Sequence, residues 1–304
     1  MSKIAIVGGS GFIGTQTTKE LIYNGHEVTV IDINPPRVSE CDYICADCTN
    51  YLQLLQALDG GYDYVYMFAA ISDSSENNRS PLLAIDRNIV GLANVLQSVA
   101  MLKIKRIIFS STVWVYSVSD SINVTEDTPL PITSSDHLYT TSKLTGEALI
   151  RNYHKLLGVN YTILRYGIAY GPDCHPDTIL SRFMSNALIG KPLVITGNGS
   201  ISRNFLNVKD HARGNVAALS LAAENQIINL EGPEKITLAR VADRVKELHG
   251  EVVKIVYTDT RPGDYRGKKV SNKKSMELLK WKPMIDFQKG TEEMYEYVKG
   301  KYDN

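Results

Sequence analysis

The sequence has little cysteine, no net charge and no long apolar run, and each absence excludes a class of protein. Four cysteines among 304 residues are too few for a disulfide scaffold. Cys41, Cys45 and Cys48 lie close together, but strand alternation around Cys45 separates them and no fourth ligand follows, so we predict no metal site. Lysine plus arginine and aspartate plus glutamate both number 33, which argues against nucleic acid or an anionic membrane as a partner. No apolar run reaches the roughly 18 residues of a membrane span, and the N-terminus enters a strand without a signal peptide, so we expect a cytoplasmic protein.

Strand-like and helix-like segments alternate along the first half of the chain. This alternation predicts a Rossmann α/β fold, a doubly wound parallel sheet with helices on both faces. The expected strands are 4–7, 27–32, 43–46, 64–68, 106–110 and 161–166. The expected helices are 51–58, 82–102 and 139–157, and a polar loop is expected over 72–81.

Beyond Pro172 the alternation loosens into a smaller C-terminal α/β region. We therefore predict a cofactor-binding domain over 1–172 and a substrate domain over 173–304. A helix at 209–223 and a strand at 227–230 are expected to return to the main sheet, so that 209–230 belongs to the first domain.

A glycine turn follows the first strand. The glycines are spaced Gly8-x-x-Gly11-x-x-Gly14, and Phe12 and Ile13 begin the helical spacing that follows. Glycine allows a positive φ and a close approach of the backbone to a pyrophosphate, which would lie at the positive end of the helix. The turn therefore predicts a dinucleotide site.

Carboxylates and small residues end the next strands. Asp32 ends the second strand, where a carboxylate can bind both ribose hydroxyls and repels a 2′-phosphate, so we predict NAD rather than NADP. A simple turn aspartate is the alternative. Asp47 is placed to meet the adenine amino group or, alternatively, to cap the next helix. Ala69 and Ala70 would let the backbone lie close to a ligand.

Tyr139 and Lys143 lie four residues apart, on one face of a predicted helix. An adjacent ammonium favours the phenolate, so the pair can act as base and acid in a hydride transfer. The hydroxyl cluster Ser110-Ser111-Thr112 ends the strand before this helix. A Tyr-x3-Lys spacing alone is common. The pair indicates this chemistry because it follows the glycine turn, Asp32 and the hydroxyl cluster in that order along the chain.

The chain resembles the NAD-dependent nucleotide-sugar epimerase/dehydratases, which are extended short-chain dehydrogenases/reductases, over nearly its whole length. Besides the glycine turn and the Tyr/Lys pair, the resemblance rests on Phe109-Ser110-Ser111-Thr112, Val115-Tyr116, Leu164-Arg165-Tyr166, Tyr170-Gly171-Pro172, Gly190-Lys191-Pro192-Leu193, Arg261-Pro262-Gly263-Asp264 and Trp281-Lys282-Pro283.

The resemblance implies a role for each matching residue. Tyr139 is the expected catalytic base, Lys143 orients the nicotinamide ribose and lowers the tyrosine pKa, and Thr112 binds the reacting sugar hydroxyl. The expected cofactor residues are Gly8, Gly11, Phe12, Ile13, Gly14, Asp32, Asp47, Cys48, Ala69, Ala70, Ser110, Tyr139, Lys143 and Tyr166. The expected substrate residues are Ser111, Thr112, Asp264 and two arginines that grip the diphosphate, Arg203 and Arg261.

Several positions depart from the family pattern or lie where the family varies. Val113 and Trp114 stand where hexose 4,6-dehydratases carry the Asp-Glu pair that eliminates water. Ile168 replaces an asparagine that commonly helps to hold the nucleotide phosphates. Lys268 falls where relatives vary a side chain that limits the sugar pocket, and a cation there is compatible with an acidic sugar or with simple solvation.

We therefore predict an enzyme that epimerises a nucleotide sugar, expected to be UDP-linked, at C4 through a transient 4-keto intermediate. The alternatives are a nucleotide-sugar 4-ketoreductase, a dehydratase and a non-catalytic dinucleotide sensor. The resemblance also implies a homodimer formed through the helices at 82–102 and 138–157.

Overall fold

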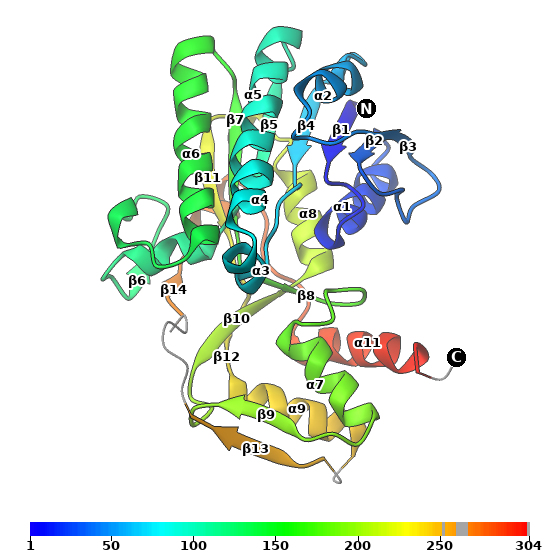
Figure 1. The fold of residues 1–304 in the computed structure, drawn as a ribbon, viewed down its shortest axis with the longest axis vertical. Helices are drawn as coiled ribbons and strands as arrows, with labels where there is room; N and C mark the ends of the chain where they lie inside the picture. Colours follow the sequence, from blue (N-terminus) through cyan, green and yellow to red (C-terminus); the bar gives the residue numbers. More distant parts are fainter. Residues whose placement is uncertain (251–252, 260–266, 303–304) are drawn as a thin grey trace.

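The computed structural model describes residues 1–250, 253–259 and 267–302, and at its centre lies a parallel sheet (Figure 1). Its strands are β1 (Lys3–Val7), β2 (Glu27–Asp32), β3 (Asp42–Cys45), β4 (Tyr64–Met67), β5 (Arg106–Thr112), β7 (Tyr161–Tyr166) and β11 (Gln226–Leu230). The seven strands follow the order β11-β7-β5-β4-β1-β2-β3, and every neighbouring pair is parallel. The order reverses at β1 and β4, which opens a crevice at their carboxyl ends. The predicted Rossmann fold is confirmed.

Helices cover both faces of this sheet. On one face lie α2 (Tyr51–Leu58), α5 (Gly91–Leu102) and α6 (Leu138–Leu157); on the other lie α1 (Phe12–Tyr23) and α8 (Val208–Ala217). Side chains along β5 alternate accordingly, with Ile107 and Phe109 on the first face and Ile108 on the second.

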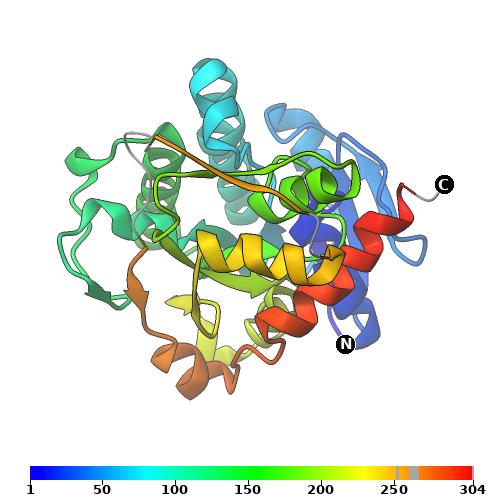
Figure 2. The ribbon, with the colours of Figure 1, turned by 90° about the horizontal axis from the view of Figure 1, so that it is seen from below.

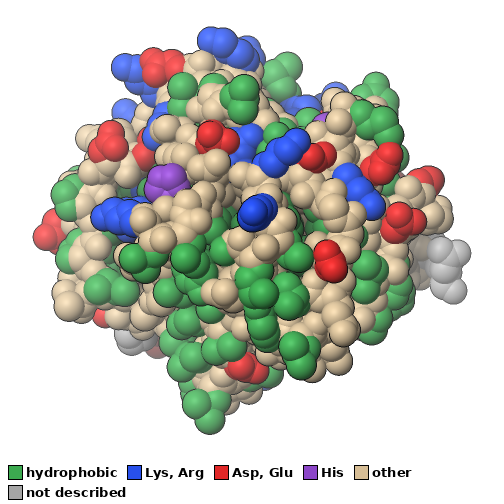
Figure 3. Space-filling view, turned by 90° about the horizontal axis from the view of Figure 1, so that it is seen from above, with side chains coloured by type: hydrophobic (Ala, Val, Ile, Leu, Met, Phe, Trp, Pro, Cys, Tyr) green, Lys and Arg blue, Asp and Glu red, His purple; other side chains and the backbone are tan. Residues whose placement is uncertain are grey.

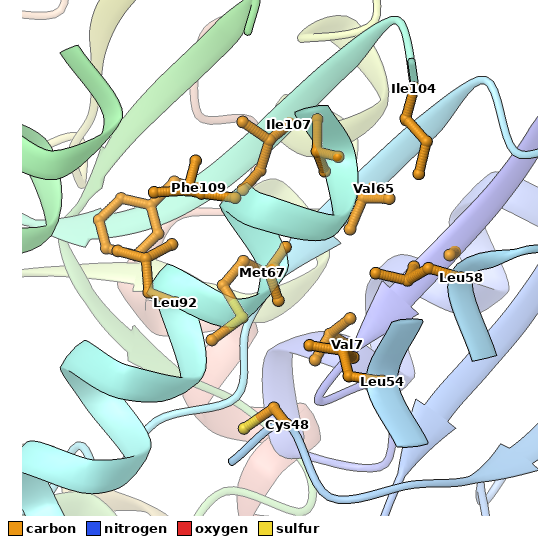
Figure 4. Close-up of a cluster of buried hydrophobic side chains, with 14 of the residues drawn as sticks. Val7, Cys48, Leu54, Leu58, Val65, Met67, Leu92, Ile104, Ile107 and Phe109 are labelled. Carbon is orange, nitrogen blue, oxygen red and sulfur yellow. The ribbon is translucent and has the colours of Figure 1, made fainter. Parts of the chain in front are cut away.

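The first face carries a large apolar cluster (Figure 4). Val7, Met67 and Phe109 come from three neighbouring strands and pack beneath Leu54 of α2 and Leu92 of α5, and all five side chains are buried. Each such side chain contributes roughly 1.5–3 kcal/mol when it is removed from water. The cluster therefore holds the ends of these three strands side by side, where the crevice opens.

Two segments differ from the sequence prediction before α5. The expected loop over 72–81 contains α3 (Ser74–Arg79), because Asp73 caps it by accepting a hydrogen bond from the Glu76 nitrogen at 2.7 Å. The expected single helix over 82–102 is α4 (Pro81–Ile85), a π-helical turn η1 (Asp86–Val90) and then α5.

The helix expected over 209–223 is also shorter, since α8 ends at Ala217 and a separate 3-10 turn, η4 (Leu221–Ala223), follows. Arg106 supplies the physical reason. Its buried guanidinium donates to the carbonyl oxygens of Ala218, Leu219 and Ser220 at 3.3, 2.8 and 2.9 Å, and so satisfies the end of the helix.

A second layer lies beneath the carboxyl ends of the sheet (Figures 1 and 2). Three small sheets pair β8 (Ile168–Tyr170), β10 (Ser202–Asn207) and β12 (Lys235–Thr237); β9 (Leu193–Thr196) and β13 (Ile255–Thr258); and β6 (Asn123–Val124) and β14 (Lys269–Val270). The other helical segments are α7 (Ile179–Leu188), α9 (Leu238–His249), α10 (Lys273–Leu279), α11 (Phe287–Gly300), η2 (Val113–Val118) and η3 (Ile132–Ser134). Helices α7, α9 and α11 share a buried apolar core with β9 and β10. None of the helices in the described ranges is both long enough and apolar enough to cross a membrane.

Candidate active site

The glycine turn joins β1 to α1 at the point where the strand order reverses. Gly8 has φ +87°, and a Cβ there would lie 2.2 Å from the Ala69 nitrogen at the end of β4. A Cβ on Gly14 would lie 2.5 Å from the Gly8 carbonyl oxygen. Neither position can hold a side chain without moving backbone, so these two glycines fix how closely the turn, the helix and β4 pack.

Asp32 lies beside this turn with its carboxylate held in place. Its two oxygens accept hydrogen bonds from the Ser10 nitrogen at 3.1 Å and the Asn34 nitrogen at 3.0 Å. A cleft of about 180 Å³ runs past it, lined by Val7, Gly8, Gly11, Ile31, Asp32, Ile33, Asn34, Ala46, Asp47, Cys48, Phe68, Ala69, Ala70 and Arg87. Bare backbone at the mouth of α1 and an oriented carboxylate fit the pyrophosphate and the ribose of NAD.

Two residues that line this cleft, Asp47 and Arg87, add to what the sequence predicted. Asp47 forms a local turn, since its Oδ1 accepts hydrogen bonds from the nitrogen and the hydroxyl of Thr49, both at 2.9 Å, while Asn50 caps α2. Arg87 was missed. It reaches the cleft from the π-helical turn η1, and the regular helix that the spacing predicted gave no signal of that turn.

Tyr139, Lys143 and Thr112 come together where α6 begins and β5 ends. The Lys143 Nζ donates to the Ser110 carbonyl oxygen at 2.7 Å and lies 5.8 Å from the centre of the Tyr139 ring. Burial lowers the pKa of Lys143 to about 7, while the nearby Glu147 carboxylate opposes this shift. Burial raises the pKa of Tyr139 to about 12, and a hydrogen bond with the Thr112 side chain opposes that rise.

A buried polar network supports these residues from below. Glu147 follows Lys143 by one turn of α6, accepts the Ser111 hydroxyl at 2.6 Å and forms a bidentate ion pair with Arg165 at 2.9 and 2.7 Å. Arg165 also donates to the Tyr116 hydroxyl at 2.9 Å, which donates to Asn229 at 2.7 Å. This role of Glu147 was not predicted from the sequence, although the repeated four-residue spacing from Tyr139 could have indicated it.

The other expected residues lie around this centre. The Ser110 hydroxyl donates to the Met67 carbonyl oxygen at 2.9 Å, and the Tyr166 hydroxyl donates to Asn215 in the core. The Arg203 guanidinium on β10 lies 5.7 Å from the centre of the Trp114 ring, so it faces the end of β5 from the second layer. Arg261 and Asp264 lie outside the described residues.

Lys268 and the candidate metal ligands also have defined places. The Lys268 ammonium donates to the Ser119 carbonyl oxygen at 2.6 Å, which links β14 to the segment after η2. All four cysteines are free thiols, and among the described residues no cluster of histidine, cysteine, aspartate and glutamate has the arrangement of a metal site.

Known proteins are similar to this chain over nearly its whole length. The family model described as "NAD dependent epimerase/dehydratase family" matches residues 4–230. A UDP-glucuronate 4-epimerase of Thermodesulfobacterium geofontis is 28% identical over 313 residues, which covers 95% of this chain and 94% of that protein. The structure of UDP-glucose 4-epimerase from Thermotoga maritima with UDP-glucose superposes with a TM-score of 0.92 at 25% identity, covering 99% of both chains. That of UDP-glucuronic acid 4-epimerase from Bacillus cereus with UDP-glucuronic acid and NAD gives 0.88 at 28% identity, covering 99% of this chain and 100% of that chain.

Proposed function

The chain belongs to the NAD-dependent epimerase/dehydratase family, and from this premise we propose that it interconverts a UDP-linked sugar and its C4 epimer through a transient 4-keto sugar. One observation carries the proposal. The side chains of Tyr139, Lys143 and Thr112 meet at the carboxyl edge of the sheet, beside the cleft of the glycine turn. This arrangement supports a role for Tyr139 as a base next to a bound sugar hydroxyl.

The residues present fit NAD. Backbone N–H groups of the turn between Gly8 and Gly14 would hold the pyrophosphate, and Asp32 would hold the adenosine ribose. When bound, NAD supplies a reversible hydride acceptor, which makes the overall reaction redox-neutral.

Tyr139 is the proposed base that takes the proton from the sugar O4 and later returns it. Burial raises the pKa of its phenol to about 12, so at neutral pH a neighbouring group must stabilise the phenolate. The Lys143 ammonium can favour the phenolate, and Glu147 in turn favours the protonated lysine. The Thr112 side chain forms a hydrogen bond with Tyr139. We propose that it also forms a hydrogen bond with the reacting sugar hydroxyl and so orients that hydroxyl next to Tyr139.

The residues after Thr112 argue against elimination of water. Val113 is buried and apolar, and the centre of the Trp114 ring lies 6.2 Å from that of the His137 ring and 5.7 Å from the Arg203 guanidinium. Neither side chain can act as the acid or base that a dehydratase places here. We propose that Arg203 holds the diphosphate of the substrate, together with Arg261.

The test is epimerisation of UDP-glucose, UDP-N-acetylglucosamine and UDP-glucuronate, followed by NMR. We expect one or more of these to equilibrate with its C4 epimer and Tyr139→Phe to lose at least 100-fold in kcat while NAD remains bound. Net consumption of NADH would indicate a reductase instead, and absence of interconversion would refute the proposal.

We propose that the two layers bind different molecules, one the cofactor and the other the nucleotide sugar. Residues 1–172 with 209–230 would hold the cofactor, a division supported by the place of β11 in the main sheet, and 173–304 would grip the nucleotide sugar. The expected cytoplasmic location stays a prediction.

We also propose a homodimer. Leu82, Val90, Met101 and Leu157 are exposed apolar residues of α4, η1, α5 and α6, and apolar side chains gather along one side of the face seen in Figure 3. Sedimentation velocity should show a dimer for the wild type and a larger monomer fraction for Leu82→Glu.

A further inference from the structure

Arg87 is the only cation among the described residues that line the cleft beside the glycine turn, whose carboxylates come from Asp32 and Asp47. The Arg87 side chain is partly exposed. Within residues 1–250, 253–259 and 267–302, its guanidinium forms no hydrogen bond or ion pair with a protein group. The proposed reaction gives it no role, so its N–H donors and its flat face are available to a ligand in the cleft.

A π-helical turn places Arg87 at this cleft. The turn η1 lies between α4 and α5, and such turns are frequent at functional sites. Gly91 follows Arg87 by four residues and packs against the cleft wall, since a Cβ there would lie 2.8 Å from the Cys48 Sγ. Residues four apart lie on the same side of a helix. Arg87 therefore lies about one turn before this contact and on the side that faces Cys48.

The next residue, Asn88, fixes the turn from both sides. Its Oδ1 accepts a hydrogen bond from the Ile71 nitrogen at 2.8 Å, and its Nδ2 donates to the Ile71 oxygen at 3.1 Å. The same Nδ2 lies 3.2 Å from the Ser142 hydroxyl on α6, and Asn88 is only 4% exposed. The backbone from which the Arg87 side chain extends is therefore held by the loop after β4 and by α6.

The strand order shows which part of a dinucleotide would lie next to Arg87. The glycine turn follows β1, Asp32 ends β2, and Ala46 to Cys48 follow β3, and these three strands are neighbours in that order. Pyrophosphate, ribose and adenine are joined in the same order in NAD. With the pyrophosphate at the glycine turn and the ribose at Asp32, the adenine reaches the wall formed by Ala46, Asp47 and Cys48, about one strand spacing further out.

Electrostatics place the Arg87 charge at this outer wall. Burial raises the pKa of the Cys48 thiol to about 11, the Asp47 carboxylate adds to the rise, and the Arg87 charge opposes it. A guanidinium is flat and always charged, so it can lie face to face with an aromatic ring. The pyrophosphate would be bound instead by the backbone N–H groups of the glycine turn, at the other end of the cleft.

We propose that Arg87 is a cofactor-binding residue whose guanidinium stacks on the adenine ring of NAD at the outer end of the cleft. The inference rests on the part of the proposed function that assigns NAD to this cleft. It gives the adenine an interaction that neither the glycine turn nor Asp32 supplies, because those groups would hold the pyrophosphate and the ribose.

The experiment measures cofactor binding by the full chain after bound nucleotide has been removed. Dissociation constants for NAD and ADP-ribose are determined by calorimetry for the wild type, Arg87→Met, Arg87→Lys and the matched control Arg182→Met, which changes an exposed arginine of α7 outside the cleft. Methionine keeps the unbranched stem and a similar helix propensity without the charge, and lysine keeps the charge without the plane.

Nicotinamide mononucleotide, which has a phosphate but no adenine, is titrated into the same proteins and followed by NMR. Thermal unfolding checks that each variant is folded. Epimerisation of UDP-glucose is followed in parallel with saturating NAD.

We expect Arg87→Met to bind NAD and ADP-ribose at least fivefold more weakly than the wild type, and nicotinamide mononucleotide with less than a twofold change. Arg87→Lys should remain at least threefold weaker for NAD, because an ammonium cannot stack as a plane. Arg182→Met should match the wild type.

Three results would overturn the proposal: unchanged NAD affinity in folded Arg87→Met, full recovery by lysine, or an equal loss for nicotinamide mononucleotide. The last two would indicate a contact of Arg87 with phosphate instead. A wild type that binds no NAD would overturn both this inference and the assignment of the cofactor. The expected losses of binding without epimerisation in any variant would refute the proposed reaction and still support stacking by Arg87.

Discussion

Glu147 shows how one buried residue can support several site residues at once. It accepts from Ser111, pairs with Arg165 and raises the pKa of Lys143. We expect Glu147→Gln to lower the free energy of unfolding by about 3–5 kcal/mol, because it leaves the Arg165 charge buried without its partner. Urea unfolding measures this. The control Glu292→Gln removes an exposed partner of Arg244, which keeps Glu247, and should cost less than about 1 kcal/mol. Equal losses in both variants would contradict the argument.

Glu231, a buried carboxylate that directly follows β11, should make stability depend on pH. Its pKa is raised from 4.5 to about 8 in the folded protein, so the folded state binds more protons than the unfolded state between these values. Stability from this group is therefore present below about pH 4.5 and is lost as the pH rises towards 8, by up to about 1.4 kcal/mol per pH unit. Glutamine does not titrate, so the stability advantage of Glu231→Gln over the wild type should grow from pH 5.5 to 7.5 and level off above pH 8. Urea unfolding across this range measures the difference, and Glu234→Gln, which changes an exposed glutamate three residues away, serves as a control with no expected pH dependence.

The sequence predicted only those site residues whose chemistry is indicated by a spacing within one element or by a position at the end of one strand. The glycine turn, Asp32 and the Tyr139/Lys143 pair each have a pattern within one element or at one strand end. Arg87 has none, because it reaches the cleft from a π-helical turn that regular helical spacing does not indicate. The roles of the predicted site residues stay predictions until substitutions test them.

At the scale of elements, two glycines of the turn between β1 and α1 have different roles. Gly14 allows close backbone packing, and Gly11 lines the cleft. A Cβ on Gly14 would meet backbone at 2.5 Å, whereas a Cβ on Gly11 would meet no atom closer than 3.4 Å. We expect Gly14→Ala to lose about 1–3 kcal/mol of stability by forcing α1 away from β1. Gly11→Ala should cost less than about 1 kcal/mol, because the position is an extended N-cap that alanine can adopt.

Both variants should bind NAD at least 10-fold more weakly, the first because the turn shifts and the second because a methyl group would face the ligand. Calorimetry with NAD and urea unfolding without it separate the two effects. Equal stability losses in the two variants would show that Gly14 has no special packing role.

Most elements were predictable because a buried parallel strand is a continuous apolar run, and β2, β7 and α2 begin and end where the pattern placed them. The interruptions of the expected helices were not predictable from the sequence. The π-turn before α5 and the early end of α8 depend on tertiary contacts, and in the second case on Arg106, which is 112 residues from Ala218. Helical periodicity has no information about a partner that distant.

At the scale of the whole molecule, one polar cluster ties the cofactor side to the second layer. Arg37, in the loop after Asp32, forms an ion pair with Asp173, which follows Gly171-Pro172 and has φ +70°. Asp173 also accepts the Tyr297 hydroxyl at 2.7 Å and lies 3.5 Å from the Lys301 ammonium, both on or next to α11. The loop that borders the ribose position is thereby linked to the last helix of the chain.

This link should act on how long the cofactor stays bound rather than on stability. Arg37 is 54% exposed, so Arg37→Ala should change the free energy of unfolding by less than about 1 kcal/mol. We expect the NAD dissociation rate, followed by stopped-flow fluorescence, to rise at least threefold, because the loop after Asp32 loses its anchor on the second layer. Arg240→Ala is the matched control, since Arg240 forms an ion pair of similar exposure within α9, away from the cleft, and should leave the rate unchanged. The same rate in wild type and Arg37→Ala would mean that the two layers hold NAD independently of this contact.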